Sequence, residues 1–172
     1  MAGVQVEPGA IVANQGTARV GTSTGSAVMV VSGLMTGVLT VEAGGFLEGT
    51  GSVGNVTATS GGTIVPGLAG SIGILYAQSV NLSGGGVLYI QISGYQIPGT
   101  DFSRLVTGSL TLGGSSKLTL DLSGLTGPGV VGGIVTDAGQ SGNFSTVQVI
   151  NNPFSFGDTI IYRSDSIDVG IF

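Results

Sequence analysis

Alternating apolar and polar residues form a short phrase that occurs twice between residues 37 and 67. The phrase contains two apolar residues at alternate positions, a pair of glycines three residues on, and a further apolar residue. Its first copy is Leu39, Val41, Gly44, Gly45 and Leu47, and its second, 17 residues later, is Val56, Ala58, Gly61, Gly62 and Ile64. A repeat of this length is typical of stacked strands in a β-solenoid. We therefore interpret the stretch as two neighbouring rungs.

The alternation also predicts which face of a rung is buried. Successive side chains of a strand point to opposite faces, so we expect Leu39 and Val41 to point inward and Thr40 and Glu42 to meet water. Glycine suits the corner after such a strand, because without a Cβ it can adopt positive φ and allow close approach of the next rung. The expected corners are Gly9, Gly25, Gly44, Gly45, Gly61, Gly62, Gly85 and Gly86.

Further copies of the phrase extend the coil in both directions. We place upstream copies at Val4 and, with a looser match, at Val20, and downstream copies at Val80 and Leu110. The upstream Val4 copy runs through Val6, Gly9, Ala10 and Val12, the Val20 copy through Thr22, Gly25, Ser26 and Val28, and the Leu110 copy through Leu112 and Leu118. The chain is thus predicted to form about six irregular rungs.

The intervals between copies predict two loops and a cap. Loops are expected over 66–77 and 93–103, where the spacing between copies lengthens. From about residue 127 the phrase is lost, and short strand-like runs separated by turns follow. The aromatic residues concentrate there, at Phe144, Phe154, Phe156, Tyr162 and Phe172. We predict one continuous all-β domain with rungs over 1–127 and a C-terminal β cap over 128–172, in which these aromatics close the core.

Composition indicates a folded chain with an unusually uncharged surface. Apolar residues make up 41%, charged residues only 8%, and glycine 34 of the 172 positions, with a mean hydropathy of +0.54. Disorder goes with low hydrophobicity and high net charge, whereas this composition is typical of secreted or surface-exposed proteins. The four basic residues, Arg19, Arg104, Lys117 and Arg163, are scattered, so we expect no nucleic-acid partner. No apolar run is long enough to span a membrane.

The reactive motifs in the sequence do not predict an enzyme. The chain has no His and no Cys, which removes the usual zinc ligands and thiol nucleophiles; we therefore expect no metal site, no cofactor and no catalytic residues. GTGSVG at 49–54 matches a dinucleotide-binding pattern, but a strand follows where a helix is needed. GTSTG at 21–25 matches a nucleophile elbow but lacks a histidine base, and nothing places Lys117 to replace it.

Paired carboxylates leave a carbohydrate-active β-helix as an alternative. Glu42 and Glu48 flank one corner, and Asp165 and Asp168 lie near the C-terminus. Glycoside hydrolysis needs two carboxyl groups across one sugar. These acids are isolated in the sequence, so the simpler expectation is that they are solvated and point outward.

The segment 37–172 resembles the C-terminal part of bacterial autotransporter passenger domains and their associated β-strand repeats. The resemblance is carried by LEGTGSVGNV at 47–56, GGTIVPG at 61–67, SIGIL at 71–75 and the spaced Asp, Leu, Val and Gly residues of 101–114. It implies a right-handed parallel β-helix on the outside of a bacterial cell, in proteins that commonly serve as adhesins or structural stalks.

The functional expectation is therefore a non-enzymatic structural or adhesive segment of a bacterial surface or secreted protein. Its partners would be host or environmental glycans or surface proteins. One alternative is a carbohydrate-binding or carbohydrate-active β-helix, in which Tyr76, Tyr89 or Tyr95 would stack on sugars. A second alternative is a self-assembling filament subunit that associates through an open N-terminal rung.

Overall fold

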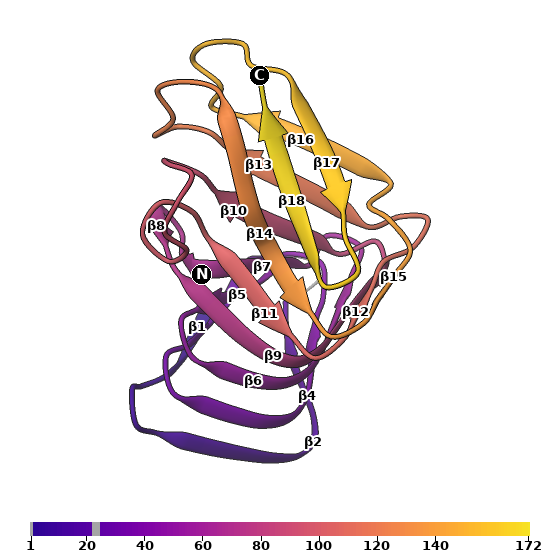
Figure 1. Ribbon diagram of the computed structural model, residues 1–172. Coiled ribbons are helices and arrows are strands. Elements are labelled where there is room, and N and C mark those ends of the chain that lie inside the picture. Colours follow the sequence, from indigo (N-terminus) through magenta and orange to yellow (C-terminus); the bar gives the residue numbers. More distant parts are fainter. Residues whose placement is uncertain (1, 22–24) are drawn as a thin grey trace.

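The computed structural model describes residues 2–21 and 25–172, and this part of the chain is all-β, without a helix (Figure 1). Sheet A has the order β1 (Ala2–Val6), β3 (Ala27–Val31), β5 (Gly45–Gly49), β7 (Thr63–Leu68), β10 (Val87–Gln91), β13 (Lys117–Asp121) and β16 (Thr146–Ile150), with β8 (Ser71–Ile72) beside β7. Sheet B has the order β2 (Ile11–Val20), β4 (Leu34–Val41), β6 (Ser52–Thr59), β9 (Ile74–Gly84), β11 (Arg104–Thr107), β14 (Gly129–Asp137), β18 (Ser166–Ile171) and β17 (Asp158–Tyr162). Two short strands, β12 (Leu110–Thr111) and β15 (Gln140–Ser141), pair with each other, and β12 also pairs with β9.

The chain passes back and forth between the two sheets, and most neighbouring strands within each sheet are parallel. Figure 1 shows the strands of sheet B stacked from β2 at one end to β17 and β18 at the other. The register predicted from the repeat is confirmed in the middle of the chain, where Leu39 lies opposite Val56 and Leu47 opposite Ile64. The same row continues to Val80 in sheet B.

The inner faces of the two sheets form one apolar core. In sheet A, neighbouring strands place Leu47, Ile64, Leu88 and Leu118 in a single row, and each of these side chains is fully buried. A fully buried Leu or Ile contributes about 1.5–3 kcal/mol. A single strand has too few such side chains to be stable alone, so each strand depends on its neighbours in the two sheets.

At the N-terminus the predicted register is wrong. Val4 belongs to sheet A and lies opposite Met29, so it does not share the sheet B row of Leu39. Val20 lies opposite Val41 instead of Leu39. Strand β2 contains a register shift between Ala13 and Thr17. Alternation looks the same in both sheets, so the pattern alone could not assign these short runs to a sheet.

Two neighbouring glycines illustrate how the corners are built. Gly61 has a φ of 82°, in the region that favours glycine. Gly62 is not among the glycines with positive φ, but a Cβ there would lie 2.2 Å from the carbonyl oxygen of Val41 in β4. Gly44–Gly45 and Gly85–Gly86 occupy the same corner in adjacent rungs, between β4 and β5 and between β9 and β10. Gly25 precedes β3, whereas Gly9 lies in the opposite corner, between β1 and β2.

Parallel pairing continues well beyond residue 127. Strand β14 is parallel to β11, and β16 is parallel to β13. Antiparallel pairing at this end is confined to β18, which pairs with β14 and with β17. The antiparallel strands therefore begin after β16, which is later in the chain than residue 127, where the repeat is lost.

The C-terminal aromatics divide into two groups. Phe144 is buried, and Phe156 and Tyr162 pack against the core. The Tyr162 hydroxyl also accepts a hydrogen bond of 2.9 Å from the Phe144 amide. Phe154 and Phe172, in contrast, are 58% and 67% exposed, so these two do not close the core as expected. Both lie outside the strands, where an aromatic residue in the sequence does not imply burial.

Both predicted loops are ordered by their own hydrogen bonds. In 66–77, β7 and β8 form a small antiparallel hairpin that turns at Ala69 and Gly70. In 93–103, a carboxylate oxygen of Asp101 accepts hydrogen bonds of 3.0 Å from the amides of Gln96 and Ile97. The hairpin positions the candidate site.

Candidate binding cleft

The three tyrosines proposed for stacking lie in different parts of the molecule. Tyr76 is 45% exposed and lies on the outer face of sheet B. Tyr95 lies in the 93–103 loop, where its hydroxyl donates to the carbonyl of Gly127 and its ring packs on the core. Tyr89 is on the outer face of sheet A. The structure therefore does not bring the three together into one sugar-stacking platform, and of the three it is Tyr89 that lines the cleft described next.

This cleft, with a volume of about 350 Å³, lies where the β7–β8 hairpin folds over the outer face of sheet A. It is lined by Val28, Phe46, Glu48, Thr63, Val65, Ala69, Gly70 and Tyr89. The strand residues alternate with the buried core residues, which places them on the outer face. Register aligns Val28, Phe46 and Thr63 in one row across β3, β5 and β7. The volume falls within the range of about 300–1,000 Å³ that is usual for small-molecule sites.

Glu48 carries the only charge in the cleft lining. Its residue is only 8% exposed, and Oε2 accepts a hydrogen bond of 3.1 Å from the amide of Ala69 in the hairpin turn. The prediction that Glu48 is solvated is thus wrong, although it does point outward. The side chain is covered by the hairpin turn at Ala69, which is 21 residues later in the chain. The alternating pattern around Glu48 does not predict this contact.

Gln91 fixes the hairpin from its other side. Its Nε2 donates to the carbonyl oxygens of Leu68 and Ser71, both at 3.1 Å. The hairpin is therefore held to sheet A at β5 through Glu48 and at β10 through Gln91. Such convergent hydrogen bonds keep a site in one shape and reduce the ordering that binding would require.

The opposite wall of the cleft is also held in place. The Tyr89 hydroxyl donates to Asp121 Oδ2, and Asp121 Oδ1 accepts from the Ser123 amide at 3.0 Å and from Asn151 Nδ2 at 3.1 Å. Burial, and then the hydrogen bond to Asp121, raise the pKa of Tyr89, so its hydroxyl stays neutral. Burial alone would raise the pKa of Asp121, but the hydrogen bonds from Tyr89, Ser123 and Asn151 lower it overall.

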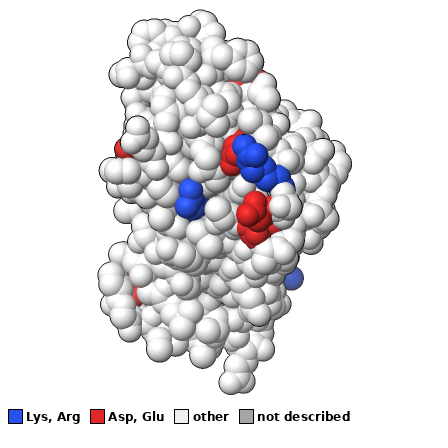
Figure 2. Space-filling view, viewed as in Figure 1, with Lys and Arg blue, Asp and Glu red and all other residues white. Residues whose placement is uncertain are grey.

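The other acids predicted as candidates are separated from this cleft. Glu42 pairs with Arg19, and Asp168 pairs with Arg163 and accepts a hydrogen bond of 2.7 Å from the Gly133 amide. Asp165 is exposed. Figure 2 shows how few charges one face carries: several blue and red atoms lie together near β14 and β18, and the others are scattered singly over the face. Among residues 2–21 and 25–172, no group of three or more acids, histidines or cysteines is placed to hold a metal ion.

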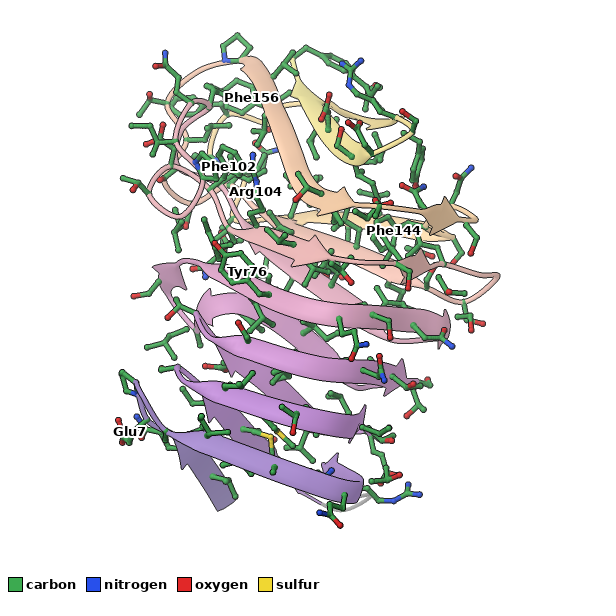
Figure 3. All side chains as sticks on the ribbon, turned by 60° about the horizontal axis from the view of Figure 1, so that its bottom comes forward. Glu7, Tyr76, Phe102, Arg104, Phe144 and Phe156 are labelled. Atoms are coloured by element: carbon green, nitrogen blue, oxygen red, sulfur yellow. The ribbon has the colours of Figure 1, made fainter. Side chains whose placement is uncertain are left out.

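Arg104 serves the structure of sheet B. Its Nε and Nη2 donate to the carbonyl oxygens of Gly133 and Gly132 at 2.6 and 3.0 Å, and its guanidinium lies 5.4 Å from the ring centre of Phe102. Figure 3 shows Arg104 beside Phe102, with Tyr76 in the neighbouring part of the sheet. Burial lowers the pKa of Arg104, and the nearby Tyr76 and Asp168 oppose that shift. The guanidinium thus supports β14 where its pairing with β18 shifts register.

The glycine motif at 49–54 falls where the chain turns from sheet A to sheet B. The segment 49–54 connects β5 to β6, and no helix follows it. Gly49 has a φ of 129°, and a Cβ there would lie 2.0 Å from the carbonyl oxygen of Val31. The centre of the 21–25 motif, together with the inward position expected for Thr22, lies outside the described residues.

A second unusual polar group lies at the C-terminal end of the stack. Asp137 continues the inward row of Val53, Ala77 and Thr107, and Gln140 continues the row of Val80 and Leu110. Asp137 is buried, and among the described residues neither of its carboxylate oxygens accepts a well-formed hydrogen bond. Gln140 Oε1 is also buried without a partner. Burial raises the pKa of Asp137; the nearby Asp165 adds to the shift, and the Gly139 amide only partly offsets it.

Asp137→Asn is expected to stabilise the protein at neutral pH and to have a smaller effect in acid. The folded state holds the proton of the Asp137 carboxyl group more tightly than the unfolded state does. The stability of the wild type therefore falls as the pH rises from the pKa of Asp137 in the unfolded state through its raised pKa in the folded state. The Asp137→Asn side chain has no proton to release in this pH range, so the variant does not lose stability in this way. Urea unfolding at about pH 4 and about pH 7 measures the difference. The exposed Glu7 provides the control Glu7→Gln, and an Asp137→Asn effect that does not change with pH would contradict the assignment.

Comparisons with known proteins add no family or relative. No protein-family model matches the chain, and no curated protein sequence is significantly similar to it. In the part of the chain that the structure describes, no helix is long and apolar enough to cross a membrane.

Proposed function

We propose that this chain is a segment of a right-handed β-solenoid that serves as a non-enzymatic structural or adhesive element of a bacterial surface or secreted protein. The observation that carries the proposal is the parallel register that runs through the strands of sheet A from β1 to β16. Connections between parallel strands of one sheet are right-handed in about 98% of cases, which supports the handedness. A stack of this kind presents long side faces on which binding surfaces can be carried.

Two further features support an extracellular role. The chain carries few charges, with only four basic and nine acidic residues in 172. The segment 37–172 also resembles autotransporter passenger domains, which work outside the bacterial cell. In the proposed role, the cleft beneath the β7–β8 hairpin is the principal binding site, because it is the hollow that combines apolar walls with a buried charge.

The proposal is tested by measuring adhesion and turnover together. Beads coated with the purified chain are expected to be retained on surfaces coated with glycans or cell-surface proteins, while beads carrying heat-denatured chain are not. Incubation with a panel of polysaccharides is expected to release no reducing ends and no unsaturated products. Turnover that is abolished by an acid-to-amide change such as Glu48→Gln or Asp121→Asn would overturn the non-enzymatic role.

Carbohydrate binding is the second candidate, favoured by the exposed ring of Tyr76. Its neighbours across sheet B are Ser52 and Val106, so a sugar could stack on the ring without a deep pocket. Under this candidate, glycan-array signals of the wild-type chain would fall in Tyr76→Ala. An array on which the wild-type chain gives no signal would argue against it.

Self-association is a third candidate, favoured by β1 and β2, which each pair with a strand on one side only. Val4, Ile11 and Val12 are exposed on these strands, and unpaired edges promote pairing with other chains. Association that increases with concentration in sedimentation experiments and is weakened by Ile11→Lys would support this candidate. A monomer at every concentration would rule it out.

A further inference from the structure

We infer that the cleft beneath the β7–β8 hairpin binds an organic ammonium group, that is, a positively charged nitrogen on an apolar stem. The inference rests on the proposed binding role of this cleft and specifies the chemistry that the cleft would select. Three properties carry it: the walls of the cleft, its buried carboxylate, and the engagement of the basic residues elsewhere.

The walls suit an apolar stem. Phe46 and Tyr89 contribute aromatic rings, and Val28 and Val65 contribute aliphatic surface. Covering the methylene groups of a stem in such a site is favourable. Aromatic faces also attract cations, most strongly where the faces are desolvated.

The carboxylate of Glu48 supplies the charge that an ammonium group would meet. More than nine-tenths of this residue is buried, and in the described part of the chain its carboxylate accepts one hydrogen bond, from the Ala69 amide. One neutral donor leaves this carboxylate with unused acceptor capacity in the cleft, and a charge in such a site is stabilised by an opposite charge. A cationic ligand would complete the site.

The protein's own basic residues do not neutralise Glu48. Arg19 pairs with Glu42, and Arg163 with Asp168. The Arg104 guanidinium donates to backbone carbonyls of β14. Lys117 is exposed on β13, two strands away from β7, and no ion pair between it and Glu48 occurs among the described residues.

The same features disfavour other ligands. A sugar requires many polar partners, but the Tyr89 hydroxyl is already engaged by Asp121, and Thr63 is the only other hydroxyl in the lining. An anion would be repelled by Glu48 and by the net charge of −5. That net charge would instead raise the local concentration of a cation.

A titration with three probes of equal chain length tests the inference on the wild-type chain. Hexylammonium chloride, hexanol and sodium hexanoate share one stem and differ in their head group. In NMR titrations we expect the ammonium to bind at least about tenfold more tightly than the alcohol, a difference of about 1.4 kcal/mol, and the carboxylate not to bind. Equal affinities for the ammonium and the alcohol would overturn the inference without any variant.

Variants then identify the groups responsible. Glu48→Gln is expected to weaken hexylammonium binding about tenfold and to bring it close to the affinity for hexanol, whereas Glu7→Gln, at an exposed site outside the cleft, leaves both unchanged. Phe46→Ala is expected to weaken the binding of hexylammonium and the binding of hexanol to the same extent. Circular dichroism confirms that each variant is folded. Unchanged ammonium affinity in folded Glu48→Gln would show that the carboxylate is not the partner.

A peptide probe distinguishes a free amine from a lysine side chain of a protein partner. Nα-acetyl-lysine methylamide carries the ammonium on a four-carbon stem with its backbone capped, and norleucine in the same form lacks the charge. Tighter binding of the lysine form, lost in Glu48→Gln, would indicate that protein partners can use the cleft. Binding of hexylammonium alone would restrict the cleft to small amines. If the wild-type chain binds none of the amines but the coated beads still adhere, this inference is refuted and the proposed function stands.

Discussion

Replacing Val41 by Asp is expected to remove most of the stability of the protein, whereas Thr40→Asp leaves it nearly unchanged. Val41 has no exposed surface and lies between Val20 and Ala58 in the neighbouring strands of sheet B. An aspartate there would bury a carboxylate without a partner and lose a packed side chain, at a cost of about 4 kcal/mol or more. The total free energy of unfolding of a folded domain is about 5–15 kcal/mol.

Thr40 is the matched control because it is the adjacent residue of the same strand on the opposite face. It is only partly buried, and its neighbours are Arg19 and Thr57. An aspartate at this position stays hydrated beside a basic residue, so we expect a change within about 0.5 kcal/mol. Denaturant unfolding followed by circular dichroism measures both variants. Equal losses of stability would mean that the inner and outer faces of β4 are assigned the wrong way round.

The second large effect is expected from Gly62→Ala. Its new methyl group would lie 2.2 Å from the carbonyl oxygen and 2.7 Å from the carbonyl carbon of Val41. These atoms belong to the backbone of the preceding rung, and Gly62 is itself tied to the next rung by the hydrogen bond of 2.9 Å from the Val87 amide to its carbonyl. Neither rung can move without breaking the ladder, so we expect a loss of about 3 kcal/mol or more.

Gly114→Ala provides the control for this steric effect. A Cβ at Gly114 would meet no atom within 4 Å, and we expect a change of no more than about 0.5 kcal/mol. In calorimetry, the Gly62 variant should melt about 6–12 °C below wild type, while the Gly114 variant melts close to it. A mild effect at Gly62 would show that neighbouring rungs are less closely packed at this corner than the structure indicates.

The middle of the stack could be predicted from the sequence because two signals agree there. Alternation identifies the inner face of each strand, and the equal spacing of Leu39 and Val56, and of Leu47 and Ile64, aligns one rung with the next. At Val4 the alternation and a glycine corner both recur, but Gly9 turns the opposite corner, between β1 and β2, so this signal does not identify the sheet. That signal is compatible with either sheet, which is why the first rung was assigned to the wrong one.

The candidate site could not be predicted in the same way. Tyr89 was proposed as a ligand-binding residue, but the pattern did not connect it with Phe46 or Glu48, which lie on another strand of sheet A, β5. These residues become neighbours through parallel pairing, and the hairpin that covers them is an insertion without repeat signal. The separation of Tyr76 and Tyr95 from the cleft likewise depends on which sheet or loop carries each ring.

The pattern of residues alone was enough to predict that this protein is all-β, which face of each central strand is buried, and where glycines turn the chain. These properties are local, since they follow from the alternation of side chains and from the absence of a Cβ. Tertiary contacts alone reveal that the Ala69 turn covers Glu48 on the outer face of sheet A, and that Asp137 is buried on the inward row of sheet B. Such burial depends on contacts between residues distant in sequence, which a local pattern does not encode.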